Sequence, residues 1–299
     1  MAVRAKTSAK ARAPLALALL AGFGACATDH GAKWARYEAV MRDAGLMRSD
    51  YDPPDAPFVA DDLIRNFEKV ALHSEFPMEN TAVARETPIP LDRWSGEVEW
   101  AMSGDGLRAE DFADMRRITR RATALTGLGI VSAPPGAAAR HVHIRVLMLN
   151  AVERALMAGA MYDTPAATRN RFVIAWLEDE DWPCMAVGGE IPIGPDRGKR
   201  FEGIFIRDEL RGLNRRSCIE EELIQTLGLY NDGDDVRPSM FNDDEEFALI
   251  TRHDEFLLRI LYDPRLRPGM TADQAMPVVA RIVAGLDLAG DPAATRAAR

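Results

Sequence analysis

The sequence has little cysteine, few aromatic residues and less positive than negative charge. Its 299 residues include three cysteines, 7% aromatic residues, and 37 Lys and Arg against 46 Asp and Glu, so the formal net charge is −9 at pH 7. Nucleic-acid binding depends on clustered Lys and Arg that neutralise phosphates, so this balance argues against a nucleic-acid-binding protein. A phosphate-binding loop, a dinucleotide-binding glycine fingerprint and a Gly-x-Ser-x-Gly nucleophile elbow are also missing.

Long apolar runs are equally scarce, and the one apolar stretch of note lies at the N-terminus. It covers Pro14 to Ala25 and follows a basic stretch, Arg4 to Arg12, that contains no acidic residue. A transmembrane helix needs roughly 20 apolar residues, so this stretch is too short to span a bilayer. A basic segment followed by a short apolar core is typical of a secretory leader, and we predict a signal peptide over residues 1–25.

The cysteine that follows the leader predicts a lipid anchor. Gly24-Ala25-Cys26 resembles the bacterial lipobox, in which the cysteine is acylated and becomes the first mature residue. We therefore expect Cys26 to tether the protein to a membrane, with simple secretion as the alternative. The residues that follow Cys26 are Ala27 and Thr28. The absence of an Asp at these positions favours a periplasmic lipoprotein of the outer rather than the inner membrane. Removing the leader takes the formal charge from −9 to −13, which argues against a polybasic membrane-binding surface.

Two cysteines remain in the mature chain. Cys184 and Cys218 are the simplest pair for a disulfide in an exported protein, because such compartments are oxidising.

The pattern of apolar residues divides the mature chain into an accessory region and a larger domain. Residues 26–90 read as a tether and helical accessory segment, residues 91–287 as one α+β domain, and residues 288–299 as a disordered tail. Within the domain, helical spacing predicts a helix over residues 109–126, and an apolar run predicts a strand over residues 172–177. The order of a helix, several strands and then helices indicates an α+β fold.

One segment carries a motif with a known chemistry. Glu221-Glu222-x-x-Gln225-x-x-Gly228-x-x-Asn231 resembles the His-Glu-x-x-His-x-x-Gly-x-x-His motif of metzincin zinc peptidases. In that frame, Glu221, Gln225 and Asn231 stand at the three metal-ligand positions. Glu222 stands at the position of the general base, and Gly228 stands at the turn.

The resemblance continues downstream of this helix. The segment 238–242 is similar to the turn that follows the zinc site, with Phe241 where that family has Met, and residues 249–262 resemble the final helix. The resemblance implies a zincin-like α+β fold, which combines a mixed sheet with the motif helix and with C-terminal helices.

The chain is identified more closely with a family of bacterial lipoproteins of unknown function, the domain-of-unknown-function 2927 family. Three segments carry this resemblance to the family. They are the Glu-Glu-x-x-Gln-x-x-Gly-Leu helix, the Phe-Asn-Asp turn and the final segment Leu261 to Leu266. The likeness spans Leu63 to Gly269, and it implies a zincin-like fold without a known activity.

The substitutions in the motif bear on whether it holds a metal. Zinc prefers His nitrogen and Cys sulfur, and the amides of Gln225 and Asn231 are poor ligands for it. We therefore expect a degenerate site and no resident cofactor. A separate acidic loop could bind calcium through several carboxylates, or it could be a solvated turn. Its aspartates are Asp232, Asp234, Asp235, Asp243 and Asp244.

These observations lead to three hypotheses of function. The first is a lipid-anchored pseudopeptidase that binds a peptide, a protein or an envelope component in the former substrate cleft. The second is a metal-dependent hydrolase that uses Glu222 as general base and non-His ligands for a hard ion such as calcium or manganese. The third is an envelope scaffold that assembles through residues 27–80.

Overall fold

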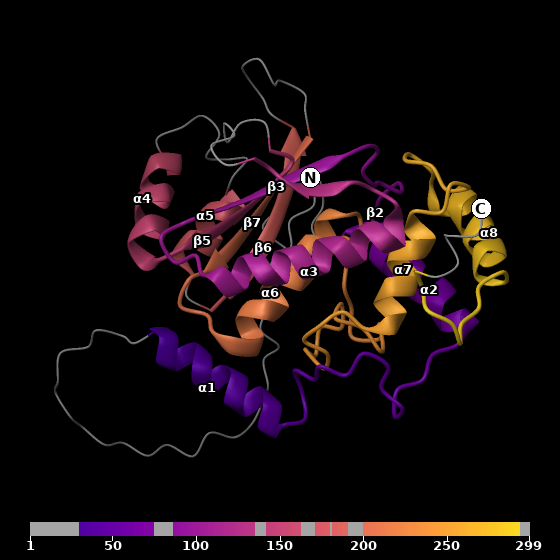
Figure 1. The fold of residues 1–299 in the computed structure, drawn as a ribbon, viewed down its shortest axis with the longest axis horizontal. Helices are drawn as coiled ribbons and strands as arrows, with labels where there is room; N and C mark the ends of the chain where they lie inside the picture. Colours follow the sequence, from indigo (N-terminus) through magenta and orange to yellow (C-terminus); the bar gives the residue numbers. More distant parts are fainter. Residues whose placement is uncertain are drawn as a thin grey trace.

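The computed structural model of the chain (Figure 1) describes residues 30–74, 86–134, 142–162, 171–179, 181–190 and 200–293. The predicted signal peptide 1–25, the lipidation site Cys26 and the end of the predicted tail, 294–299, lie outside the described residues. In the described part of the chain, no helix combines the length and the apolar character that a membrane crossing requires.

A five-stranded sheet forms the centre of the domain. Its strands are, in spatial order, β4 (Ile130–Ser132), β3 (Val98–Ser103), β5 (Ile144–Leu149), β7 (Arg200–Arg207) and β6 (Cys184–Glu190). The first four run parallel, and β6 pairs antiparallel with β7 at the edge. Mostly parallel sheets are covered by helices on both faces, and that is the arrangement here.

Alternate strand residues face two separate apolar layers. One layer contains Val146, Met148, Ile204 and Ile206 and packs with α3 (Ala109–Thr126) and α6 (Gly212–Thr226). The other contains Leu149, Met185, Val187 and Phe205 and packs with α4 (Ala151–Tyr162) and α5 (Arg171–Glu178). In Figure 1, α4 and α5 lie together at one end of the molecule. The α+β class expected from the sequence is therefore confirmed, with a sheet that is covered on both faces.

Two helices show where the sequence patterns predicted secondary structure correctly and where they did not. α3 covers the predicted residues 109–126, and Gly127 caps it in the left-handed conformation at φ 73°. The predicted strand 172–177 is wrong, because these residues form the body of α5. Val173, Trp176 and Leu177 are buried at the i, i+3, i+4 spacing of a helix face, and a short apolar run does not distinguish that pattern from a buried strand.

Three of the remaining helices gather at the other end of the molecule from α4 (Figure 1). They are α2 (Ala60–Ala71), α7 (Arg252–Leu261) and α8 (Ala272–Val283), and a two-residue pairing of β1 (His73–Ser74) with β2 (Thr87–Pro88) lies beside α2. α2 belongs to the predicted accessory region, yet Leu63, Phe67 and Val70 are fully buried in the same core as the sheet. A fourth helix, α1 (His30–Asp43), packs against α6.

The described part of the predicted tail contacts α7. The Arg252 side chain donates a hydrogen bond to the carbonyl of Gly290 at 2.9 Å, and Arg121 forms an ion pair with Asp291 at 2.8 Å. Residues 288–293 are thus held against the helices that precede them.

Candidate functional site

The motif helix α6 lies in the interior of the protein. Every residue from 217 to 229 is buried, and this includes the polar positions of the motif. The exposed fractions are 2% for Glu221, 0% for Glu222 and 2% for Gln225. A helix that is buried all round forms part of a core, whereas the helix of a hydrolytic metal site must present its ligands to water and substrate.

A neighbouring carboxylate that the motif does not include has clear ion-pair partners. Glu220 is fully buried and pairs with Arg216 one turn earlier, with 2.8 Å between the guanidinium Nε and the carboxylate. Arg117 of α3 contacts the same carboxylate. These pairs offset the cost of burying the charge and join α6 to α3.

The motif glycine lies where the chain leaves α6. Gly228 has φ +120°, a conformation that side chains with a Cβ rarely adopt. A Cβ there would lie 2.4 Å from the backbone oxygen of Asp92, so the close approach of the 92–94 segment also excludes a side chain.

Asn231, at the third ligand position, is bound to α2. Its side-chain amide donates to the carbonyl of Lys69 at 3.1 Å, and its backbone N–H donates to the carbonyl of Val70 at 3.1 Å. The side chain is 2% exposed. It thus satisfies carbonyls at the end of a helix, which is a structural role.

The turn after the motif is held by one buried carboxylate. Asp254 accepts hydrogen bonds from the Ser239 hydroxyl, from the backbone N–H of Met240 at 3.1 Å and from the backbone N–H of Thr251 at 2.9 Å. Phe241, at the position of the metzincin methionine, is fully buried, and its backbone N–H donates to the Ser239 hydroxyl at 3.0 Å. The network fastens the 238–242 turn to the first turn of α7.

The acidic loop does not converge on a common point. Asp235 forms an ion pair with Lys69 at 2.7 Å, and this hydrogen bond lowers the pKa of the Asp235 carboxyl. The Asn242 amide donates to the backbone carbonyl of Asp234 at 3.1 Å, which closes the loop on itself. Over the residues that the structure describes, no three His, Cys, Asp or Glu side chains are grouped as ligands of one metal ion.

A polar cluster that the sequence analysis did not predict lies at the C-terminal end of α6. The Arg200 guanidinium lies 4.1 Å from the centre of the Trp94 ring and forms ion pairs with Asp92 and Glu202, both at 3.0 Å. Arg200 also donates to the hydroxyl of Tyr230, which in turn donates to Asp92 at 2.9 Å. We name these five residues the Arg200 cluster.

The cluster is anchored on the last turn of the motif helix. The carbonyl oxygen of Thr226 accepts a hydrogen bond from the Trp94 indole at 2.8 Å and a longer one from Arg200 at 3.4 Å. Positive charge near the C-terminus of a helix is favoured by the helix dipole. Arg200 and Glu202 are two apart on a strand and share a face, which is the one sequence signal that could have indicated the cluster.

Glu202 is the buried titratable group of this cluster. It is 5% exposed, and burial raises the pKa of its carboxyl to about 7, although Arg200 acts in the opposite direction. Burial also raises the pKa of Tyr230 well above its ordinary value. The neighbouring strand leaves room for the Glu202 carboxylate only because residue 188 is glycine, since a Cβ there would lie 2.2 Å from a carboxylate oxygen.

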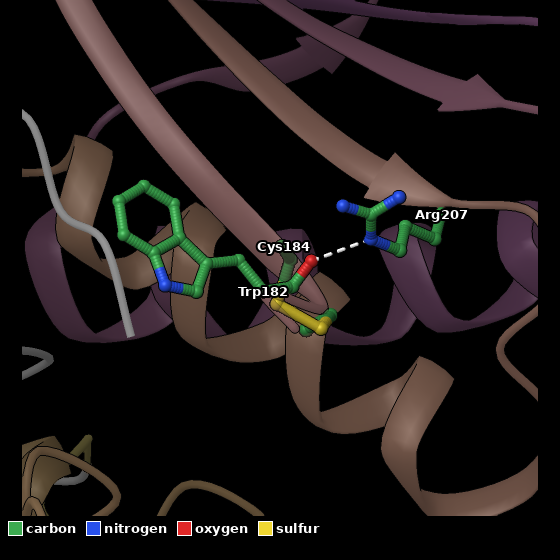
Figure 2. The surroundings of a disulfide bond; sticks show 4 residues. Trp182, Cys184 and Arg207 are labelled. Atoms are coloured by element: carbon green, nitrogen blue, oxygen red, sulfur yellow. Dashed lines mark hydrogen bonds between the residues drawn. A yellow bond between two sulfur atoms is a disulfide. The ribbon is translucent and has the colours of Figure 1, made fainter. Parts of the chain in front are cut away.

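The predicted disulfide between Cys184 and Cys218 is confirmed, with an S–S distance of 1.98 Å. It joins the edge strand β6 to α6, one helical turn before Glu221 (Figure 2). In the same view, Arg207 at the end of β7 donates to the carbonyl of Trp182, with 2.6 Å between Nε and the oxygen. The disulfide therefore holds the motif helix against the sheet.

Comparison with protein families gives a match over most of the chain. A family model described as "Protein of unknown function (DUF2927)" matches residues 60–281, which is well over half of the chain. No curated protein and no solved structure matches the chain. The matched region begins at the first residue of α2 and ends within α8, so it includes the sheet, α6 and the Arg200 cluster.

Proposed function

Because the chain belongs to the DUF2927 family, whose description states no activity, we propose from its own geometry a non-catalytic, zincin-like binding protein of the bacterial cell envelope. One observation carries this proposal. The positions at which a metallopeptidase presents its ligands and base are occupied here by Glu221, Glu222, Gln225 and Asn231, and each is at most 2% exposed.

The zincin-like part of the proposal is supported by the order of elements around α6. A mixed sheet lies on the motif helix, the helix ends at a glycine with positive φ, and a buried turn at 238–242 precedes α7. This is the arrangement that the resemblance to metzincins implies. The motif glycine and the turn would then persist for structural reasons after the metal ligands were lost.

The non-catalytic part is supported by the chemistry of the motif positions. Hydrolysis by a zincin needs a metal-bound water next to a general base. The donor set includes two neutral amides, and the Asn231 amide already donates to the carbonyl of Lys69. Glu222 is fully buried. The residues present therefore do not fit a zinc ion.

The envelope location rests on the leader, on Cys26 and on the disulfide. Disulfides persist in oxidising compartments, so the pairing of two buried cysteines agrees with export. We propose that acylated Cys26 tethers the protein to the outer membrane and that the domain binds a peptide, a protein or an envelope component. The contact of α1 with α6 would keep the tether close to the domain.

The test of the non-catalytic proposal uses the purified full chain, prepared without chelator. Elemental analysis is expected to show no stoichiometric metal, and casein is expected to remain intact with or without added zinc. Cleavage that chelators abolish and zinc restores would overturn the proposal. Glu222→Gln and Glu221→Gln then form a matched pair, because loss of such cleavage in the first variant alone would identify Glu222 as the base of an active hydrolase.

The test of the anchor is separate. Metabolic labelling with a palmitate analogue in a bacterial host should label the wild-type protein and not the Cys26→Ser variant. Membrane fractions should contain the wild type, while the variant should be released in soluble form. A labelled Cys26→Ser variant, or an unlabelled wild type, would contradict lipidation without affecting the proposal about the domain.

A further inference from the structure

A hollow lies on the face of the sheet opposite to α6. It has a volume of about 580 Å³ and is bounded by α4, by the end of α5 and by the end of β7. Binding sites for small molecules commonly have volumes of roughly 300 to 1,000 Å³. Nothing in the motif helix or in the Arg200 cluster contributes to it.

The position of the hollow in the fold favours ligand binding. β5 and β7 are parallel neighbours that end at Leu149 and Arg207, and α4 begins two residues after β5. In open sheets of parallel strands, ligands bind outside the carboxyl ends of the strands, because loops and helix starts leave a crevice there. Arg207 and the start of α4 both line the hollow.

The base of the hollow is buried and cationic. Arg154 and Arg207 reach it from α4 and β7 and are 4% and 2% exposed. Other groups fix both guanidiniums in place. Arg154 forms a two-pronged ion pair with Glu209 at 2.9 and 2.7 Å, and Arg207 donates to the carbonyls of Trp182 and Trp176. Glu209 does not line the hollow, but its carboxylate offsets one of the two positive charges, so one net positive charge remains at the base.

The rim has the opposite charge. Glu178, at the end of α5, is exposed and accepts a hydrogen bond from the Tyr162 hydroxyl at 2.9 Å, which bridges α4 and α5. Between rim and base, the wall consists of the small side chains of Ala155 and Ala158, with Gly159 beside them. These residues leave room for a compact apolar group.

We propose that this hollow binds a small zwitterion of dipeptide size, with its carboxylate at Arg154 and Arg207 and its ammonium at Glu178. The net charge is positive at the base and negative at the rim, opposite to the charges at the two ends of such a ligand. Guanidinium groups match a carboxylate in geometry, and the carboxylate of Glu178 matches an ammonium. The methyl groups of a dipeptide would lie against the alanine wall. This site is independent of the proposal made for α6.

The binding experiment uses calorimetry on the purified full chain with alanyl-alanine as the probe. Two blocked forms serve as matched controls, alanyl-alanine amide without the carboxylate and N-acetyl-alanyl-alanine without the ammonium. We expect saturable binding of alanyl-alanine in the millimolar range or tighter, and at least a tenfold loss of affinity for each blocked form. Absence of saturable binding, or equal binding of the blocked forms, would overturn the proposal.

Two variants locate the site. Ala155→Trp fills the hollow from α4, whereas Ala160→Trp places the same side chain at an exposed position of that helix that does not line the hollow. We expect at least a tenfold loss of affinity in the first variant and less than a twofold change in the second. Equal binding by both variants would place the ligand elsewhere and refute the proposal.

A third variant covers the case in which Ala155→Trp fails to fold. Glu178→Gln removes the rim charge from an exposed side chain while keeping its shape. It is expected to weaken alanyl-alanine binding about tenfold and to leave the weak binding of N-acetyl-alanyl-alanine unchanged. An unchanged affinity for alanyl-alanine in this variant would rule out the ammonium site.

Discussion

The two helical layers on the sheet differ in what they present to solvent. α6 carries the recognisable motif, and its residues from 217 onward are buried on all sides. α4 carries no motif, and it exposes Val152, Leu156 and Tyr162 beside a hollow lined by two buried guanidiniums. The motif thus lies on a helix that is buried in the core, whereas the opposite layer offers the more accessible helix. Four changes test that difference, from the largest expected effect to the smallest.

Removal of the disulfide is expected to be the largest perturbation of the α6 layer. Cys184 and Cys218 are separated by 34 residues, and closing a loop of that length stabilises a protein by roughly 3 to 4 kcal/mol. The double variant Cys184→Ala/Cys218→Ala should lower the free energy of unfolding by about that amount in denaturant titrations. A loss under about 1 kcal/mol would mean that α6 is held against the sheet by packing alone.

Protonation of Glu202 should make stability depend on pH. Burial raises the pKa of its carboxyl from 4.5 to about 7, so the folded state holds a proton that the unfolded state releases between these values. The resulting stabilisation, about 3 kcal/mol at most, is present below pH 4.5 and is lost as pH rises through about 7. Unfolding free energies measured from pH 4 to 8 should show this fall in the wild type.

Glu202→Gln is the control for that measurement, because the amide keeps the size of the side chain and cannot titrate. The difference in unfolding free energy between the wild type and this variant should change with pH in the same window. If this difference in unfolding free energy stays constant from pH 4 to 8, the pH dependence of stability does not come from Glu202.

Asn231→Ala tests whether the third motif position is structural. The variant loses the hydrogen bond to the Lys69 carbonyl in a buried place and should lower the free energy of unfolding by about 1 to 2 kcal/mol. Asp234→Ala, an exposed change three residues later, serves as the comparison and should have little effect in the same denaturant titration. Equal stability of wild type and Asn231→Ala would remove the structural explanation for this residue.

A pair of Tyr→Phe changes compares the two layers directly. Tyr230→Phe removes a hydroxyl that bonds to Asp92 and Arg200 at the end of α6, and it should cost about 1 kcal/mol, because Asp92 and Arg200 still pair with each other. Tyr162→Phe removes a hydroxyl that bonds to Glu178 on the exposed rim, and the midpoint of thermal unfolding should not change measurably. A larger effect at Tyr162 would mean that the rim of the hollow supports the fold.

Local patterns predicted several elements well. The helix over residues 109–126 has a clear apolar periodicity and a glycine at its end, and its observed bounds agree with the prediction. The disulfide followed from the two cysteines that remain once Cys26 is assigned to the predicted lipid anchor. The strand expected over 172–177 failed because a buried helix and a buried strand share the same short apolar run.

The candidate sites were harder to predict because they depend on segments far apart in the chain. The motif spacing placed five residues on one helix and turn, but spacing does not report whether that helix faces solvent or the core. The Arg200 cluster joins residues 92–94, 200–202 and 230, and the hollow joins α4, α5 and the end of β7. No local window of sequence contains either set.

The sequence by itself therefore determined what local chemistry dictates, namely helix starts and stops, the two cysteines available for pairing, and a motif without His or Cys at its ligand positions. The tertiary structure decided which of these residues reach solvent. Packing on both faces of the sheet buries α6, raises the pKa of Glu202 and leaves the hollow open beside α4. Burial results from long-range contacts among many elements, and for this reason the accessible site could be located only in the folded protein.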